Sequence, residues 1–167
     1  MNKGVAFLLF FAVITAFSGY STAQSFDLAP RVGFYLEDTD IFIGGQADIE
    51  LLDVVGLHFV PHIDFIFDED TESKWLIGLN ALYDAAPLVL GTFYVGGGIG
   101  FLRTKLDLSN FPSAQNVDEK DTESIISALA GVRFNLVRGM RPFANARISF
   151  GDDTAIVLEG GFHFSIF

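Results

Sequence analysis

Two histidines and an aspartate in the stretch LHFVPHID are the residues of this chain whose types and spacing come closest to carrying out chemistry. His58, His62 and Asp64 alternate with other residues, so a β-strand would place all three on one face. His58 and His62 are four positions apart, roughly 13 Å at the rise of a strand, which is too far for one metal ion to bind both. His62 and Asp64 are close enough for the carboxylate to orient the imidazole as a general base.

A nucleophile for such a base would have to be a serine, and Ser127 and Ser149 are the candidates. No motif surrounds either serine, and a residue facing the interior could not easily reach a lipid substrate. We therefore expect these polar residues to form an interior network, and we expect no catalytic residue and no enzyme activity.

Two further stretches resemble ligand sites but lack the residues that such sites need. Asp68-Glu69-Asp70 offers the carboxylate oxygens that hard cations prefer, without the spacing and central glycine of an EF-hand. The glycine-rich VGGGIG at Val95–Gly100 lacks the Lys-Ser/Thr pair and the helix start of a phosphate-binding loop. The sequence therefore predicts no metal site and no cofactor.

The elements that must position these residues follow from the distribution of charge. The chain has 167 residues, no cysteine, a formal net charge of −11 and 50% hydrophobic residues. Such acidity argues against nucleic acid as a partner, and acidity combined with high hydrophobicity implies that charged and apolar regions are segregated. The acidic residues gather in four segments: Glu37–Asp40, Asp68–Glu72, Leu106–Ser124 and Asp152–Asp153.

These acidic segments alternate along the chain with shorter connections, so that eight segments of alternating apolar residues remain between them. The shorter connections are Leu52–Val54, Asp84–Pro87 and Val137–Met140. The eight segments run for about 9–13 residues each, which suits transmembrane β-strands. A spanning helix over the uncharged Ala85–Leu102 is the alternative, but five glycines lie within it and each weakens a helix.

The N-terminus has the layout of a secretory signal peptide. Lys3 provides a positive start, Val5–Phe17 an apolar run and Ser21–Ala23 a cleavage site. We expect a signal peptide at residues 1–23 and one domain at residues 24–167. An uncleaved membrane anchor is the alternative, but the apolar run is short for a spanning helix.

The two faces of the expected strands differ in kind. One is aliphatic and aromatic, whereas the other combines glycine, amides and charges of both signs, as in a crowded interior. The expected interior polar network is Arg31, Asp48, Glu50, Asp64, Arg133, Arg147 and Glu159. Two aromatic belts are expected on the apolar face, near the two ends of the strands. Their residues are Phe34, Phe67, Trp75, Tyr83, Phe101, Phe134, Phe150 and Phe164.

These features together resemble the small outer-membrane β-barrels of the OmpX and OmpA membrane-domain type. The resemblance implies an all-β fold, namely an eight-stranded antiparallel up-and-down transmembrane β-barrel in the outer membrane of a Gram-negative-type bacterium. It also implies outer-membrane lipid as a neighbour and insertion by the outer-membrane assembly machinery, which would read Phe162, Phe164 and Phe167. Phe167 departs from the pattern, because it is out of step with the preceding aromatic residues. Pro30 and Pro61 lie within strands, where we expect local bulges.

The expected function is a structural or interaction role in the cell envelope. The barrel would anchor acidic extracellular loops, chiefly 106–124, and present them to an extracellular ligand. A narrow porin-like channel and a lipid-modifying outer-membrane enzyme are the alternatives, although an eight-stranded barrel is only wide enough for its own side chains.

Overall fold

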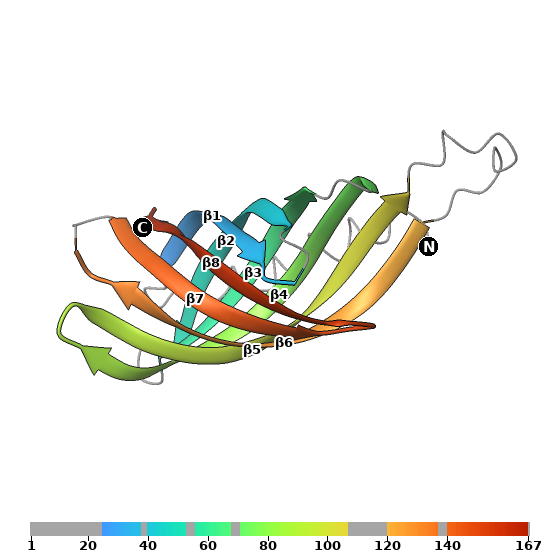
Figure 1. Ribbon diagram of the computed structural model, residues 1–167. Coiled ribbons are helices and arrows are strands. Elements are labelled where there is room, and N and C mark those ends of the chain that lie inside the picture. The colour runs from blue at the N-terminus through green and yellow to red at the C-terminus, as the bar shows by residue number, and fades with distance from the viewer. Residues whose placement is uncertain are drawn as a thin grey trace, which may run out of the picture.

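Eight antiparallel strands form one sheet that closes on itself (Figure 1). This computed structural model describes residues 25–37, 40–52, 56–67, 71–106, 120–136 and 140–166. The strands are β1 (Phe26–Tyr35), β2 (Ile41–Leu52), β3 (Leu57–Phe67), β4 (Thr71–Leu88), β5 (Gly91–Leu106), β6 (Lys120–Phe134), β7 (Met140–Phe150) and β8 (Thr154–Ser165). Each strand pairs with its neighbours in the chain, which confirms the predicted up-and-down barrel. In the described part of the chain, no helix is long and apolar enough to cross a membrane.

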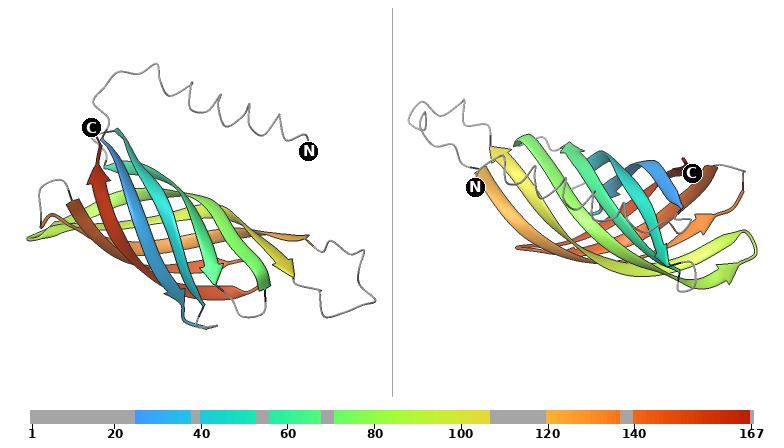
Figure 2. Two further views of the ribbon diagram at one scale, coloured as in Figure 1. Left: turned by 90° about the horizontal axis from the view of Figure 1, so that it is seen from above. Right: turned by 180° about the vertical axis from the view of Figure 1, so that it is seen from behind.

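The barrel closes where the last strand pairs with the first. Leu28 is opposite Phe164 and Phe34 is opposite Leu158, and β8 lies beside β1 when the barrel is seen from above (Figure 2). Beyond the end of β8, the Ile166 N–H still donates to the Phe26 carbonyl at 3.1 Å. The apolar C-terminal residues are therefore part of the sheet, because β1 needs them to satisfy its backbone groups.

Strands β4 and β5 are longer than the sequence suggested, with 18 and 16 residues. The turn expected at Asp84–Pro87 is wrong, because a bulge between Asp84 and Ala86 lets the ladder continue to Leu88. Val89 and Leu90 then form a two-residue turn. The expected loop at 106–124 is also too long, since β6 already begins at Lys120.

The bulges expected at Pro30 and Pro61 are not found. Pro30 stands opposite Gly45 and Pro61 opposite Leu79, with the same register before and after each proline. The ladder instead omits pairs on one side only, between β1 and β8 at Pro30 and between β2 and β3 at Pro61. A strand residue directs its N–H to one neighbour, so a proline removes one donor without shifting the strands. The bulges lie elsewhere, at Glu50/Leu52, Thr71/Ser73 and Asp84/Ala86.

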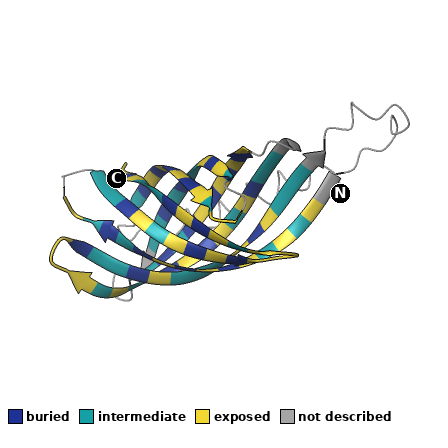
Figure 3. Ribbon diagram, in the orientation of Figure 1, coloured by how far each residue is buried: buried dark blue, intermediate teal, exposed yellow. Residues whose placement is uncertain are grey.

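Burial alternates along the strands in the sense opposite to that of a water-soluble barrel (Figure 3). Large apolar side chains are exposed, for example Ile43 at 55%, Phe65 at 54% and Ile99 at 59%. Charged side chains are enclosed, with Asp64 at 0% and Arg147 at 1%. An exposed apolar surface of this extent requires a non-aqueous neighbour.

Three of the predictions from the sequence fall on residues outside the described part of the chain. These are the signal peptide at residues 1–23, the out-of-step position of Phe167 and the expectation that Asp68-Glu69-Asp70 holds no metal ion.

A closed barrel with this surface should fold only in detergent or lipid. We expect the chain without residues 1–23 to be insoluble in plain buffer and, once refolded in detergent, to migrate differently on an electrophoretic gel before and after boiling. A chain that is monomeric and soluble in buffer, with no such shift, would contradict the fold.

Candidate functional site

The described side chains fill the barrel interior in layers. Nearest the ends of the strands that carry the acidic connections lies an apolar cluster. It consists of Phe42, Ile66, Leu76 and Val157, with Tyr35, Leu102 and Ile125 packed against it. A second apolar cluster, nearer the other end, consists of Val60, Leu82, Tyr94 and Leu129. Charged residues occupy much of the remaining interior among the described side chains.

The central charged group joins four strands through two arginines and two carboxylates. Arg31 donates from Nε to Asp64 at 2.8 Å and a second time from Nη2, which makes a bidentate pair. Arg31 also donates to Glu159 at 3.3 Å, and Arg147 donates to the other oxygen of Glu159 at 2.8 Å. Two positive and two negative side chains thus compensate each other where water is excluded.

The central group is covered on the loop side by an aromatic ring. The Arg31 and Arg147 guanidinium carbons lie 5.6 and 6.0 Å from the centre of the Phe42 ring. The negative face of the ring therefore adds to the stabilisation of both cations and separates them from the loop end.

A second charged group lies toward the start of β1, the end of β8 and the short turns. Asp48 accepts a hydrogen bond from Arg133 at 2.9 Å and contacts the His58 ring at 2.7 Å. Asp84 lies 3.5 Å from both His58 and Arg133. Beside this group, Arg141 donates to Asp27, and His163 lies 3.7 Å from Asp48.

Six of the seven residues expected in the interior network are buried there, with 0–6% exposure. They are Arg31, Asp48, Asp64, Arg133, Arg147 and Glu159. Glu50 lies apart from them and accepts a hydrogen bond from Ser25 at 2.8 Å, near the start of β1. The Glu50/Leu52 bulge falls at this point of β2, where the regular alternation ends.

Sequence reasoning missed further members of the interior groups. Asp27 and His163 share the alternation of Arg31 and Glu159 along their strands, and this signal could have identified them. Sequence reasoning missed Asp84 because a turn was expected at that position. It missed Arg141 because β7 was expected to begin after this residue, whereas β7 begins at Met140.

Asp64 and His62 make their described hydrogen bonds with other residues and not with each other. Asp64 accepts two hydrogen bonds from Arg31, and the His62 ring lies 3.4 Å from the Val60 carbonyl and 3.4 Å from Asn80. Ser127 and Ser149 are buried and stand opposite each other in the β6–β7 register. Among the described side chains, no group of three or more His, Asp or Glu is placed to hold a metal ion.

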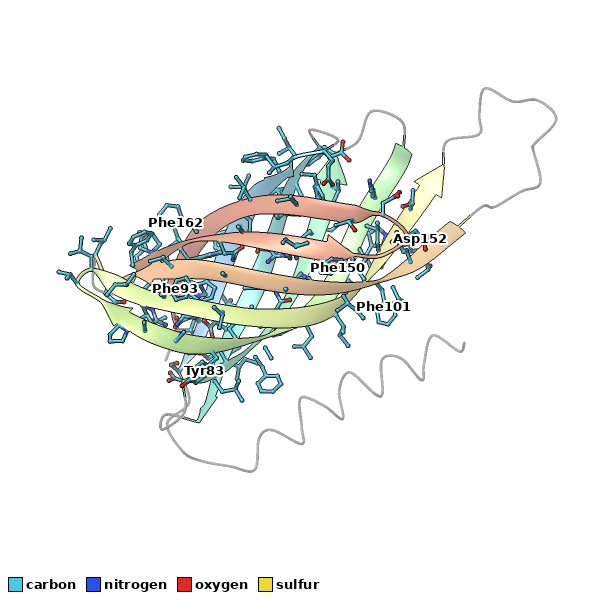
Figure 4. All side chains as sticks on the ribbon, turned by 60° about the horizontal axis from the view of Figure 1, so that its bottom comes forward. Tyr83, Phe93, Phe101, Phe150, Asp152 and Phe162 are labelled. Carbon is cyan, nitrogen blue, oxygen red and sulfur yellow. The ribbon has the colours of Figure 1, made fainter. Side chains whose placement is uncertain are left out.

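The residues expected in aromatic belts occupy the outer surface. Six are exposed: Phe34, Phe67, Tyr83, Phe101, Phe150 and Phe164. Trp75 and Phe134 are half-buried. Phe101 and Phe150 lie toward the end that carries Asp152, whereas Phe93 and Phe162 lie toward the opposite end (Figure 4). Of the residues expected to form the assembly signal, Phe162 and Phe164 are exposed on β8.

A closed eight-stranded barrel with an apolar exterior and a charged interior defines the class of transmembrane β-barrels. The chain resembles the N-terminal β-barrel domain of Pseudomonas aeruginosa OprF, with a TM-score of 0.69 and 16% identity over 85% of this chain and 97% of that chain. It also resembles Neisserial surface protein A, with a TM-score of 0.61 and 15% identity over 86% and 96% of the two chains. A de novo designed transmembrane β-barrel gives a TM-score of 0.59 and 11% identity over 85% and 95%. No protein-family model and no curated protein matches the sequence.

At such identities the likeness is one of fold. The predicted resemblance to small outer-membrane β-barrels is confirmed at this level.

The Arg31–Asp64 pair should contribute strongly to stability. Replacing Asp64 with Asn leaves the buried Arg31 without its main counter-charge, which we expect to lower the free energy of unfolding by about 3–5 kcal/mol. The measurement is a urea titration of the barrel in lipid vesicles. Asp153→Asn makes the same chemical change at an exposed position and should alter stability by less than about 0.5 kcal/mol. Equal effects of the two substitutions would contradict the role of the pair.

Two adjacent glycines of β2 provide a second test of the interior. A Cβ added at Gly44 would overlap the Ile63 carbonyl and the Asp64 carboxylate, whereas the nearest atom to a Cβ at Gly45 is 4.0 Å away. We expect Gly44→Ala to destabilise the barrel by about 1–3 kcal/mol and Gly45→Ala to leave it nearly unchanged. The same urea titration measures both, and a larger loss for Gly45→Ala would show that the faces of β2 are assigned wrongly.

Proposed function

We propose that this protein is an outer-membrane barrel with a structural and interaction role, which displays acidic connections outside the cell. The single observation that carries the proposal is the inverted distribution of side chains, with apolar residues outside and compensated charges inside. Such a barrel is stable in lipid and has its own side chains where a pore would be. What remains for contact with other molecules is the connections at its two ends.

The two ends differ in what they can present. One end carries the turn at Val89–Leu90 and other short connections. The other end carries the connection at 107–119, whose sequence includes Asp107, Asp118 and Glu119. Bacterial outer-membrane barrels have short periplasmic turns and longer extracellular loops, so we place 107–119 outside the cell. Its carboxylates would repel anionic partners and favour cationic ones.

The location and assembly of the protein belong to the same proposal. The sequence pattern at residues 1–23 supports export, and the fold supports residence in a Gram-negative-type outer membrane. Lipid then covers the exposed apolar face, and the assembly machinery of that membrane inserts the barrel with β8 as its recognition segment.

Contacts in the barrel interior favour this proposal over a solute channel and over an enzyme. Arg31 and Arg147 bridge carboxylates across the barrel beneath Phe42, which supports a closed interior over a porin-like channel. Asp64 is held by Arg31, so it is not available to orient His62 as a base. These contacts support a role without enzyme activity.

The orientation and the display can be tested with epitope tags. We expect a tag inserted within 107–119 to bind antibody on intact cells, and the same tag within 137–139 to bind only after the outer membrane is permeabilised. Flow cytometry measures both. The reverse pattern would overturn the proposed orientation.

The contribution of the loop is tested by replacing 107–119 with a two-residue Asn-Gly turn. We expect the folded barrel to persist, as judged by the shift on boiling, and attachment of intact cells to a cationic surface to fall. A control loop of the original length, with Asp107, Asp118 and Glu119 changed to Asn or Gln, should lose attachment to the same degree. Unchanged attachment with both loops would contradict the display of acidic groups.

A further inference from the structure

The hairpin of β4 and β5 projects at the end of the barrel that carries the short connections (Figure 1). The described ladder between β3 and β4 stops at Tyr83, and beyond it the Asp84 N–H donates to the Gly56 carbonyl at 3.0 Å. The pairing of β4 with β5 continues as far as Leu88 and Gly91. The last residues of β4 therefore reach past the start of β3.

The tip of this hairpin is aliphatic and exposed. Leu88, Val89 and Leu90 are 48%, 102% and 61% exposed. The Asn135 N–H donates to the Leu90 carbonyl at 2.9 Å, and the next residue, Leu136, is 57% exposed. We call Leu88, Val89, Leu90 and Leu136 the apolar tip. Neighbouring exposed apolar residues of this kind mark a surface that contacts another molecule.

The requirements of a tight turn do not explain the residues of the apolar tip. Two-residue hairpin turns favour Asn, Asp and Gly, which accept the backbone conformation that the turn needs. Val89 and Leu90 occupy these positions instead. The exposed connection between β7 and β8, Gly151–Asp153, consists of glycine and aspartate as such connections usually do. The aliphatic residues at the β4–β5 turn therefore have a reason other than the turn itself.

A bulge in β4 places Leu88 on the outer face of the barrel. Leu88 lies five residues after Tyr83, and regular alternation would put the two side chains on opposite faces. The bulge that begins at Asp84 inserts one extra residue and so restores the outer face. Tyr83 is opposite Val95 and Leu88 is opposite Gly91, and these two positions lie on one face of β5. The lipid-facing surface therefore continues from Tyr83 onto the apolar tip.

We propose that the apolar tip inserts into the lipid head-group layer at the short-turn end and fixes the depth of the barrel in the membrane. Aromatic residues such as Tyr83 and Phe134 mark the boundary between hydrocarbon and head groups. Leu88 and Leu136 lie beyond them along the chain, at the level of the head groups. Apolar side chains bind at this level by burial roughly 5–10 Å into the boundary with the acyl chains. Lipid fits the tip because the tip continues the lipid-facing surface and is uncharged.

The apolar tip makes the apolar surface taller on one side of the barrel. On the neighbouring strand, β3 begins only at Leu57, opposite Tyr83, whereas β4 continues to Leu88. A membrane accommodates an apolar surface of unequal height when the protein tilts. Insertion of the tip therefore tilts the barrel toward β4 and β5. This inference rests on the lipid contact of the proposed function, and it holds whichever end of the barrel faces outward.

The test measures what surrounds the apolar tip. The chain has no cysteine, so a single introduced cysteine can carry a fluorescent label at a chosen position. Val89→Cys labels the tip, Ile99→Cys labels the lipid-facing part of β5, and Asp152→Cys labels the exposed connection between β7 and β8. The refolded barrel is placed in lipid nanodiscs that hold one barrel each, so that water reaches both faces of the bilayer. The label is quenched either by iodide in the water or by lipids brominated on the acyl chains.

We expect iodide to quench the label at residue 89 at least about 3-fold less than the label at residue 152, because lipid shields the tip. Lipid brominated near the head group should quench the label at residue 89 more than lipid brominated near the chain ends. This order should be reversed for the label at residue 99.

A polar turn provides the matched variant. Val89→Asn with Leu90→Gly supplies the turn that hairpins prefer, so the barrel should still fold. In this variant, a label at Leu88→Cys should be quenched by iodide about 3-fold more than the same label beside the original tip, because the polar turn leaves the head-group layer. Each labelled barrel is first shown to fold by its shift on boiling.

Three results would overturn the inference: equal iodide quenching at residues 89 and 152, a label at residue 89 that brominated lipid leaves unquenched, or no effect of the polar turn at residue 88. Shielding of residue 89 that occurs only in discs with two barrels would also overturn it, since a second copy would then cover the tip. A label at residue 99 that brominated lipid does not quench would contradict the lipid contact of the proposed function. A quenched label at residue 99 with a water-exposed label at residue 89 would contradict this inference alone.

Discussion

Satisfaction of the backbone hydrogen bonds is the constraint on which the rest of this structure depends. A sheet in lipid cannot leave an open edge, because hydrocarbon offers no partner to its N–H and C=O groups. The pairing of β8 with β1 removes that edge, and the pairing continues beyond β8 to the Ile166 N–H. Closure with eight strands in turn sets a narrow interior that side chains must fill.

The narrow interior explains why charges are tolerated there and how they are arranged. A lone buried charge is costly, whereas paired and hydrogen-bonded charges compensate each other. Arg31, Asp64, Glu159 and Arg147 do so across strands that are far apart in the chain. Small residues make the space, as at Gly44, where any side chain would meet Asp64. The same contacts therefore fix the relative positions of the strands.

Because side chains occupy the interior, the parts of the barrel that can contact other molecules are its outer surface and its two ends. Where the structure describes the strand side chains, the outward alternation is apolar over most of the barrel. Many of the acidic residues lie in the connections between the strands. A barrel of this design can change its connections without any change in its core.

The sequence by itself determined the strands, their alternation and the class of fold, because these depend on residue spacing within one strand. It also placed Arg31, Asp64 and Glu159 inside and Phe101 and Phe150 outside. Only the tertiary structure decided which charges pair, how far β4 and β5 extend, and that Pro30 and Pro61 leave the register intact. It alone placed Lys105 opposite Lys120. The physical reason is that register and closure arise from contacts between strands, and a periodic pattern within one strand contains no information about its offset from the next.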